Sequence, residues 1–390
     1  MSRIDDLIAE YCPDGVKHQT LGEIGEFIRG NGIQKRDFRD SGFGCIHYGQ
    51  IYTYYGLFAD HTKSFIDPNL AEKRKKAYKG DLVIATTSEN EEDVCKACAW
   101  LGEEPIAISG DAYIFRHHQN PKYISYCFQS ELFQSQKKKY ITGTKVLRVN
   151  GDAMAKIHVP VPPLPVQEEI VRILDSFSSL EAELEAELEA RRKQYAYYRD
   201  QLIRDCPSVR WIPLSEISEN CDKSRKPIKK EKRIAGKTPY YGASGAVDHV
   251  DGFTHEGDYL LLSEDGANLL ARSMPIAYQI SGRNWINNHA HVLRIENANL
   301  RQLVEMYLNS ISLEPYITKG AQPKLTKQRM ETIVVPVPSE DDLSRIVEML
   351  TKFYALTTSL TDGLPAEIEA RRKQYEYYRD RLLSFDELAV

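Results

Sequence analysis

The chain repeats one helical segment almost verbatim. Residues 189–203 read EARRKQYAYYRDQLI and residues 369–383 read EARRKQYEYYRDRLL, so twelve of fifteen positions agree at an offset of 180 residues. Residues 157–177 also align with residues 333–353, at an offset of 176, which leaves four extra residues in the second copy. Chance does not produce matches of this length, so the chain is a tandem of two similar halves.

Both repeated segments are predicted to be helical, with one apolar stripe each. Apolar and aromatic residues recur in steps of three and four, the spacing of a coiled-coil seam. In the first copy the seam is Ile170, Ile173, Phe177, Leu180, Leu184, Leu188, Tyr195, Tyr198 and Leu202. In the second it is Ile346, Met349, Phe353, Leu356, Leu360, Leu364, Ile368, Tyr375, Tyr378 and Leu382. A helix over residues 167–204 would be ~57 Å long at ~1.5 Å per residue. A turn signal at 361–365 predicts that the second helix breaks and restarts near Pro365.

The charges of the two helices predict that they pair antiparallel. Residues 168–189 carry eight acidic side chains and one basic one, whereas residues 191–204 carry five basic and one acidic. Antiparallel pairing sets the acidic stretch 181–189 against the basic stretch 371–381, whereas parallel pairing would set like charges together. Residues 181–188 also read EAEL twice, a small repeat inside the large one.

Two segments of unlike sequence separate the helices, and each is predicted to be a globular α+β domain. Short strands are expected in the first at 44–48, 81–86 and 106–115, and in the second at 258–263, 276–280 and 291–295. The N-terminus resembles the tail of the long helix, so the repeat is circular: half-helix, globule, helix, globule, half-helix. The predicted parts are an N-terminal half-helix (1–15), a first domain (16–156), a central helical spacer (157–206), a second domain (207–332) and a C-terminal helical spacer (333–390).

Composition restricts the class of protein. The 390 residues contain no apolar run approaching the roughly 20 that span a membrane, and no secretory leader, so we expect a soluble cytoplasmic protein without membrane contact. Seven cysteines, an odd number without framework spacing, suit a reducing compartment. The pair Cys95-x-x-Cys98 lacks a second pair for zinc, so both are interpreted as small buried strand residues. The net charge of −5 hides local basic patches, because much of the acid lies in the helices.

No catalytic motif is found. An adenine methyltransferase needs an Asn/Asp-Pro-Pro-aromatic tetrad, and the nearest matches, residues 67–70 and 120–123, lack the second proline. There is no phosphate-binding GxxxxGK[ST] loop. The motif His289-Ala290-His291 enters a predicted strand and is interpreted as structural. We therefore expect no catalytic residue and no metal site.

Binding is better supported, because basic residues cluster beside aromatic residues and glycines. Residues 222–237 contain eight basic and two acidic side chains and lead into Tyr240-Tyr241-Gly242. Such a pattern suits phosphate clamping beside a base-reading loop. The predicted DNA-contacting residues are Arg29, Gln34, Lys35, Arg36, Arg39, Tyr48, Gln50, Lys73, Arg74 and Lys75 in the first domain, and Lys223, Arg225, Lys226, Lys229, Lys230, Lys232, Arg233, Lys237, Tyr240, Tyr241 and Ser244 in the second.

These features resemble a known family, the specificity (S) subunits of Type I restriction–modification systems. The carriers are RRKQYxYYRD at 191–200 and 371–380, the segment PVPPLPxQxxI at 160–170, residues 32–55 in the first domain, and the second-domain motifs at 241–245, 264–266 and 288–292. The match covers essentially the whole chain. One departure is Leu343, which stands where the first copy has Gln167.

The resemblance implies a non-catalytic DNA reader. Each domain would be a target recognition domain for one half of a bipartite, asymmetric double-stranded DNA site, and the helices would set the spacing and dock two modification (M) subunits. No cofactor is expected on this chain. S-adenosylmethionine, ATP and magnesium would be held by the modification and restriction (R) subunits. The expected partner-binding residues are Gln167, Ile170, Arg191, Arg192, Tyr195, Tyr198, Arg371, Arg372, Tyr375 and Tyr378.

Two alternatives remain open from the sequence. One is the specificity half of a bifunctional nuclease–methyltransferase, which would need several hundred further residues with the missing motifs. The other is a coiled-coil scaffold that binds only protein. The basic and aromatic segments argue against the scaffold, and a DNA gel shift with and without methyltransferase partners separates the two.

Overall fold

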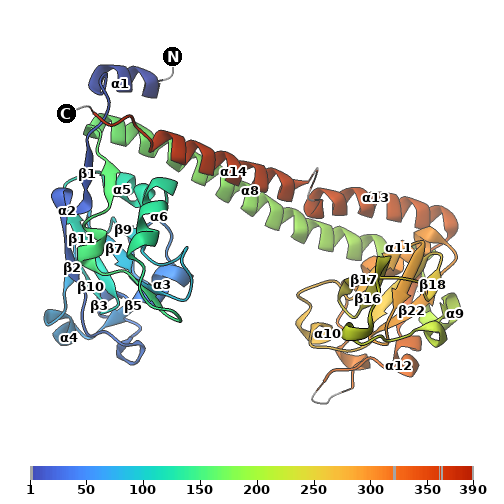
Figure 1. Ribbon diagram of the computed structural model, residues 1–390. Coiled ribbons are helices and arrows are strands. Elements are labelled where there is room, and N and C mark those ends of the chain that lie inside the picture. Colours follow the sequence, from blue (N-terminus) through green and yellow to red (C-terminus); the bar gives the residue numbers. More distant parts are fainter. Residues whose placement is uncertain (1–2, 319–321, 360, 362, 389–390) are drawn as a thin grey trace. The chain divides into compact units, whose positions relative to one another are not determined.

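The computed structural model describes residues 3–318, 322–359, 361 and 363–388. The chain divides into two compact units: unit 1 comprises Met1–Glu185 with Ile368–Val390, and unit 2 comprises Ala186–Glu367. Each unit contains one mixed α/β domain together with segments of the long helices (Figure 1). The predicted fold class is confirmed.

The domain of unit 1 is built on two sheets. The larger has the order β2 (Gly25–Arg29), β11 (Ala112–His117), β7 (Leu82–Ala85), β9 (Lys96–Trp100), β4 (Phe58–Ala59). The smaller has the order β5 (Ser64–Ile66), β3 (Phe43–Ile46), β10 (Ile106–Ile108), β6 (Lys76–Ala77). A short pair joins β12 (Leu147–Arg148) to β8 (Thr87–Ser88). The predicted strand 81–86 is the fully buried β7, whose Leu-Val-Ile-Ala sequence suits a strand covered on both faces.

Short helices surround these sheets. They are α1 (Arg3–Tyr11), α2 (Leu21–Ile24), α3 (Tyr48–Thr53), α4 (Pro68–Glu72), α5 (Pro121–Cys127), α6 (Glu131–Lys137) and α7 (Gly151–Met154), with 3-10 turns at Lys35–Asp37 and Lys138–Tyr140. The two tetrads nearest to a methyltransferase motif are helix starts. Asp67 and Asn120 cap α4 and α5 with their side-chain oxygens, and proline follows each as the first helical residue.

The domain of unit 2 also has two main sheets. One has the order β15 (Glu219–Asn220), β22 (Ala290–Arg294), β19 (Tyr259–Ser263), β20 (Ala277–Ile280). The other has the order β17 (Gly245–Val250), β16 (Ala235–Gly242), β21 (Arg283–Ile286), β18 (His255–Glu256). The helices are α9 (Leu214–Ile217), α10 (Asn268–Ala271), α11 (Ala298–Leu308) and α12 (Lys327–Glu331), with 3-10 turns at Asp222–Ser224, Lys230–Lys232 and Glu314–Tyr316. The three strands predicted here are β19, β20 and β22.

Two strand predictions in unit 1 were wrong in extent. The stretch 106–115 is not one strand, because the chain turns at Ser109, whose carbonyl accepts from the Ala112 amide at 3.2 Å, and β10 and β11 join different sheets. The predicted strand 44–48 ends at Ile46, where His47 caps α3 by accepting from the Gly49 amide.

The repeat is visible in the strands that lead into the helices. In unit 1, β13 (His158–Pro160) pairs antiparallel with β1 (His18–Thr20). In unit 2, β23 (Val334–Val337) pairs antiparallel with β14 (Arg210–Pro213). Each domain therefore begins and ends in an equivalent antiparallel pair of strands.

The long helix α8 runs from Leu164 to Arg204, three residues earlier at its start than predicted. Pro165 fits in the first turn of α8, because the backbone N–H that proline lacks would have no acceptor within the helix there. The second helix is two helices, α13 (Glu340–Thr358) and α14 (Leu364–Leu382), which confirms the predicted break. A Cβ on Gly363 would come within 2.8–2.9 Å of the carbonyl oxygens of Ala355, Leu356 and Ser359, so the junction requires glycine. Leu360 and Asp362 lie outside the described residues.

The helices pair antiparallel within each unit, as predicted from charge. In unit 1, Arg372 of α14 binds Glu181 and Glu185 of α8, both at 2.6 Å, and Phe177 stacks on Tyr378 with ring centroids 5.5 Å apart. In unit 2, Tyr195 of α8 faces Tyr354 of α13 at 5.7 Å, and Tyr198 faces Phe353 at 6.0 Å. In both pairs the residue number rises on α8 while it falls on the partner helix.

The predicted circular arrangement is confirmed in unit 1, where the two terminal segments of the chain meet (Figure 1). Val16 donates to the Asp386 carbonyl at 2.9 Å and accepts from the Leu388 amide at 3.1 Å. α1 packs into the same core as the beginning of α8, with Ile4 buried there. Among the residues that the structure describes, no helix is both long and apolar enough to cross a membrane.

Candidate nucleic-acid interface and partner surfaces

Two basic segments of unit 1, residues 35–39 and 73–75, are linked through the residues just before the first of them. The Asn31 side chain donates to the Lys73 carbonyl at 3.1 Å and accepts from the Lys75 amide at 2.8 Å. Gly32 has a φ of +52°, and a Cβ there would lie 3.0 Å from the Arg74 guanidinium. The structure therefore places residues 31–32, which precede the cations of 35–39 in the chain, beside the segment 73–75. The cations of the two segments are named here basic patch 1: Lys35, Arg36, Arg39, Lys73, Arg74 and Lys75.

Other predicted contact residues of unit 1 hold the domain together. Gln50 accepts from the His47 amide at 3.0 Å and donates to the Ser64 hydroxyl at 2.7 Å, so both ends of its amide are engaged. Tyr48 is half-buried, with its backbone amide donating to Ser109. Gln50 therefore has a structural role in the domain, and its contact with DNA stays a prediction. Arg29 and Gln34 are exposed, and Arg29 donates to the Gly110 carbonyl at 3.2 Å.

In unit 2 the basic segment lies along β21 and β16. The Lys226 amide donates to the Ile286 carbonyl, and its own carbonyl accepts from the Trp285 indole at 2.6 Å. The Ile228 amide donates to the Tyr240 hydroxyl at 3.0 Å. These anchors leave the lysine side chains exposed and define basic patch 2: Lys223, Lys226, Lys229, Lys230, Lys232 and Lys237. Ser244 is also exposed and Tyr241 is half-buried.

Two predicted contact residues of unit 2 belong instead to the support beneath patch 2. Tyr240 is only 1% exposed, and the Arg233 guanidinium lies 4.2 Å from its ring centre while pairing with Asp248 at 2.9 Å. Tyr240 is therefore a core residue of the domain, and its contact with DNA stays a prediction. Arg233 is a partly buried clamp between the patch and β17 rather than a free cation.

Arg225, another predicted DNA contact, lies inside a buried ionic network. Its guanidinium binds the Glu264 carboxylate, the Asp222 carboxylate at 3.2 Å and the Ala290 carbonyl at 2.8 Å. His291 contacts Asp222 at 2.7 Å and the Leu325 carbonyl at 2.8 Å. These groups come from four segments of the domain: 222–225, Glu264, 290–291 and Leu325. The network therefore anchors the start of basic patch 2 to the sheet.

The ionic network determines the charge states of its carboxylates. Burial alone would raise the pKa of Asp222, but hydrogen bonds from His291 and Val292 with the charge of Arg225 outweigh it and leave that pKa lowered. Burial would likewise raise the pKa of Glu264, yet Arg225 and Lys324 lower it. Both groups are therefore carboxylates at neutral pH.

The predicted structural role of the His-Ala-His motif agrees with this geometry. Asp222, Glu264 and His291 bring ligand atoms within 4.8 Å of one another, a grouping that could hold a metal ion. Arg225 and Lys324 already supply positive charge to these carboxylates, with Lys324 3.0 Å from Glu264. The other histidine, His289, pairs with Asp265 at 2.9 Å.

The two cysteines of the CxxC pair are buried, as predicted. Cys98 lies in β9, and Cys95 precedes that strand with a φ of +69°. Burial raises the pKa of both thiols to about 12, so neither is a thiolate at neutral pH.

Several predicted partner contacts are covered by the chain itself. Gln167 donates to Gln119 at 2.8 Å and to the Pro162 carbonyl at 2.7 Å, and it accepts from the Asn120 amide at 3.0 Å. Ile170 is fully buried in the core of unit 1. Tyr375 donates to Gln129 at 3.1 Å. Gln167 and Ile170 therefore seat the first domain on α8, and their contact with a partner stays a prediction.

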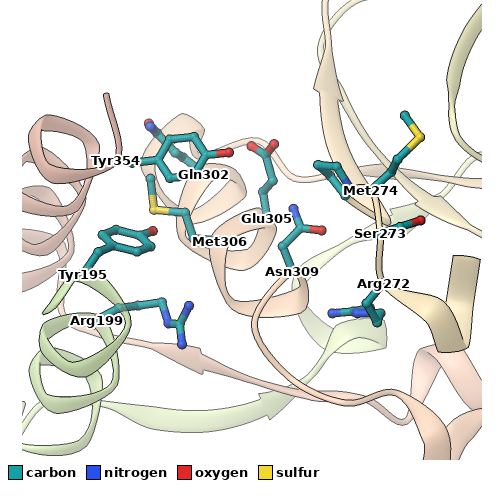
Figure 2. Close-up of a pocket in the computed structure, with 11 residues that line it drawn as sticks. Tyr195, Arg199, Arg272, Ser273, Met274, Gln302, Glu305, Met306, Asn309 and Tyr354 are labelled. Carbon is teal, nitrogen blue, oxygen red and sulfur yellow. The ribbon is translucent and has the colours of Figure 1, made fainter. Parts of the chain in front are cut away.

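The other predicted partner residues differ in availability. Tyr195 is buried between α8, α11 and α13, beside a cavity of about 340 Å³ (Figure 2). Arg191 pairs with Glu187 at 2.7 Å, Arg371 donates to Gln374 at 3.0 Å, and Arg372 is held by α8. Arg192, Tyr198 and Tyr378 are exposed.

The sequence reasoning missed one pair of exposed aromatic residues. Tyr197 is 62% exposed and Tyr377 is 59% exposed, and each contacts its neighbouring tyrosine edge to face, at 5.5 Å and 5.3 Å respectively. They occupy equivalent positions of the repeat but lie off the apolar seam. A tyrosine at the same position of both copies, where the apolar seam does not require one, is the sequence signal that could have indicated this pair.

Comparison with known proteins identifies the family. The model of the Type I restriction modification DNA specificity domain matches residues 13–190 and again 210–370. This chain belongs to the Type I restriction–modification specificity family. Both basic patches therefore lie in a chain of the specificity family.

Curated members of the specificity family are similar over part of their length. A putative type I restriction enzyme specificity subunit of Haemophilus influenzae is 37% identical over 184 residues, 46% of this chain and 47% of the relative. The EcoR124I/EcoR124II specificity subunit of Escherichia coli is 33% identical over 262 residues, 61% of this chain and 65% of the relative. The chain thus spans about half to two thirds of these two relatives.

Solved structures share the fold. The HsdS subunit of Thermoanaerobacter tengcongensis superposes with a TM-score of 0.52 at 16% identity, covering 96% of this chain and 97% of that chain. A chain from a structure concerned with complex assembly and conformational transition of the type I R-M system gives a TM-score of 0.62 at 16% identity, covering 95% and 98%.

Proposed function

We propose that this chain is the DNA-reading subunit of a Type I restriction–modification complex. Each domain reads one half of a bipartite, asymmetric site in double-stranded DNA, and the helices set the distance between the halves. The observation that carries the proposal is the presence of two different basic patches, one in each domain, on a frame that is repeated. A repeated frame with unlike surfaces suits recognition of two unlike sequences.

The chain itself performs no chemistry in this proposal. Modification subunits hold S-adenosylmethionine and transfer the methyl group, and restriction subunits hold ATP and magnesium. The competing function, a scaffold that binds only protein, leaves both basic patches without a ligand.

The experiment that tests the function compares the chain alone with the chain plus modification subunits. The chain alone should bind duplex DNA in a gel shift without methylating it. Addition of modification subunits should give methylation at one bipartite sequence, read by methylome sequencing. Methyl transfer by the highly purified chain alone would refute the non-catalytic role, and absence of DNA binding with and without partners would favour the scaffold.

We expect basic patch 2 to contact phosphates rather than bases. Replacing Lys229, Lys230 and Lys232 with alanine should weaken binding on all sequences alike, because phosphate contacts carry no sequence information. The slope of log K against log salt should flatten by roughly one unit for each phosphate that is no longer neutralised. Binding titrations at several salt concentrations measure both effects.

A matched control removes three exposed lysines outside both patches: Lys138, Lys139 and Lys156. This variant should keep the native salt slope. If the patch variant instead recognises a changed sequence with an unchanged slope, these lysines read bases.

The exposed tyrosines are proposed to dock the two modification subunits. Tyr197→Ala and Tyr377→Ala should each remove one subunit from the assembled complex, and the double variant should remove both, because exposed aromatic anchors dominate such interfaces. The mass of the complex measured by light scattering reports the stoichiometry. Tyr78→Ala, an exposed tyrosine of the first domain, is the control and should assemble normally. Full assembly of the double variant would place docking elsewhere.

A further inference from the structure

The cavity of about 340 Å³ in unit 2 lies where α8, α11 and α13 meet the loop that follows α10 (Figure 2). Its volume is within the roughly 300–1,000 Å³ that small-molecule sites occupy, and such sites combine apolar walls with a few convergent polar groups. Among the described residues that line it, none belongs to basic patch 2. The lining includes Arg199, Arg272 and Glu305 as polar groups, and Met274 and Tyr354 as apolar ones.

Arg272 follows α10 in a backbone conformation that few side chains adopt. Its φ is +54°, where glycine or asparagine is the usual residue after a helix. Its Nη2 donates to the carbonyls of Leu308 and Ile311, at 2.9 Å and 2.8 Å, and so holds the end of α11. Its Nη1 is buried and has no hydrogen-bond partner among the described residues. One nitrogen of the guanidinium therefore has a structural role, and the other is a donor available to a ligand.

The positive charge of Arg272 is not balanced by an ion pair with any carboxylate in the described part of the chain. Burial lowers the pKa of Arg272, whereas Arg233, which pairs with Asp248, has a raised pKa. The guanidinium is nevertheless charged at neutral pH. A partly buried charge without a counter-charge is unfavourable, and a bound anion would supply that counter-charge.

A second guanidinium reaches the cavity from another element. In Figure 2 the side chains of Arg199 and Arg272 point toward one another, from α8 and from the loop after α10. Only 13% of the Arg199 side chain is exposed, and its ion-pair partner Asp200, at 2.7 Å, lines a neighbouring cavity of about 240 Å³. Guanidinium groups bind the oxygens of phosphates and carboxylates through their N–H donors. The two arginines therefore form a site for an oxyanion.

The corresponding position of unit 1 belongs to its core. Asn120 caps α5 and Asn297 caps α11, and eight residues after these caps stand Phe128 and Glu305. Phe128 is 2% exposed and packs against Phe133 with ring centroids 4.3 Å apart, whereas Glu305 lines the cavity. The frame that the two halves share therefore does not require a polar residue at this position.

We propose that the cavity of unit 2 binds a small molecule that carries a phosphate monoester, with the phosphate held between Arg199 and Arg272. A phosphate monoester has about two negative charges at neutral pH, which matches two guanidinium groups. A carboxylate and a backbone phosphate of DNA each have one. Met274 and Tyr354, 52% and 44% exposed, offer apolar surface to the rest of the molecule. This binding function is additional to the proposed reading of DNA, because the site is separate from both basic patches.

Glu305 weakens the hold of the cavity on an anion. Its carboxylate accepts from the Gln279 amide at 2.7 Å, and burial raises its pKa. A charged carboxylate in the cavity opposes a phosphate, so Glu305→Gln should tighten binding about threefold. The new amide keeps an oxygen that can accept from Gln279. If the polar lining had only a structural role, this substitution would bring no gain in affinity.

The test measures binding of adenosine monophosphate (AMP), inorganic phosphate and adenosine to the full chain by titration calorimetry. AMP should bind, and adenosine, which lacks the phosphate, should bind about tenfold more weakly. Inorganic phosphate should also bind more weakly than AMP, because it leaves the apolar walls uncovered. Failure of AMP to bind, or equal affinities for AMP and adenosine, would overturn the proposal. The measurement needs neither DNA nor modification subunits, so its failure would leave the proposed function standing.

Substitutions identify the side chains that hold the phosphate. Arg272→Gln and Arg199→Gln should each weaken AMP binding about tenfold, because each removes charge-assisted hydrogen bonds. Arg283→Gln, at an arginine of β21 whose side chain is 63% exposed, is the matched control and should bind AMP as the wild type does. Arg272 also holds α11, so Arg199→Gln and Glu305→Gln provide readings that do not depend on the folding of the Arg272 variant. Unchanged AMP affinity in Arg199→Gln and Glu305→Gln would overturn the assigned contacts.

A competition experiment separates a free phosphate monoester from the DNA backbone. A duplex without terminal phosphates should not displace AMP. Arg199→Gln should also keep the wild-type slope of log K against log salt for DNA binding. Displacement of AMP by the duplex, with a flatter slope in this variant, would mean that the cavity takes a backbone phosphate and would overturn the proposal.

Discussion

Inserting one more Glu-Ala-Glu-Leu after Leu188 should lengthen the unread gap in the DNA site by one or two base pairs and leave both half-sites unchanged. The segment 181–188 already contains two copies, and α8 is continuous through them. Four residues add up to ~6 Å at ~1.5 Å per residue, and duplex DNA rises ~3.4 Å per base pair. The native sequence should then no longer be methylated.

The helix should tolerate this insertion. Four residues are just over one turn, so the apolar seam rotates by only ~40°. The ion pairs of Arg372 with Glu181 and Glu185 precede the insertion point and stay intact. Extending the register of Tyr195 against Tyr354 places Leu188 opposite the α13–α14 junction. The helix that pairs with α8 is already interrupted there.

Methylome mapping of the insertion variant measures the gap directly. Deleting one copy should shorten the gap, and Glu183→Gln, which changes no length, should keep it. The competing view is that the repeat is only good helix-forming sequence. An unchanged gap in an active insertion variant would mean that the helix does not set the spacing.

Replacing Arg225 with alanine should destabilise unit 2 by about 3–5 kcal/mol, since it leaves buried carboxylates without their main counter-charge. Arg225 joins Asp222 and Glu264, and all three side chains are mostly buried. Denaturant unfolding measures the change in the free energy of unfolding. Lys226→Ala, the exposed neighbour, should change stability by less than about 0.5 kcal/mol. A destabilisation below about 1 kcal/mol for Arg225→Ala would show that Lys324 and His291 suffice.

The effect of Arg225 should depend on pH in a defined direction. The folded-state pKa values of Asp222 and Glu264 are lowered, so the stability they add is present above their unfolded values of about 4. It is lost as pH falls through the lower folded values. The difference between wild type and Arg225→Ala should therefore be full above about pH 5 and shrink below about pH 4. A difference that grows in acid would contradict the assigned charges.

The helical frame was predictable because its signals are local and repeated. The seam, the charge blocks and the glycine–proline break are each contained within a few turns of sequence, and the structure confirms all three. The packing of Gln167 and Ile170 inside unit 1 was not predictable, for a physical reason. Periodicity shows that a helix face is apolar or bears a polar residue, but it does not show which neighbour covers that face, and here the neighbour is the first domain.

The binding surfaces were predictable only as composition. A run of lysines and arginines signals phosphate binding, yet its members separate in three dimensions. Arg225 turns inward because two segments distant in sequence supply acceptors for it, Glu264 and the Ala290 carbonyl, whereas Lys229 and Lys230 stay in solvent. The hydrogen bonds that join Asn31, just before the first basic segment, to Lys73 and Lys75 were marked by no pattern in the sequence.

The contact between the terminal segments of the chain also sets the order in which the two units can be completed during translation. Unit 2 is one continuous stretch, but unit 1 needs residues 368–388, which leave the ribosome roughly 200 residues after Glu185. At roughly 5–20 residues per second that delay is roughly 10–40 s. During that delay Val16 lacks its backbone hydrogen bonds with Asp386 and Leu388. Phe177 of the nascent helix lacks its stacking partner Tyr378. Unit 2, the later half, can therefore be completed before unit 1, the earlier half, which awaits residues 368–388.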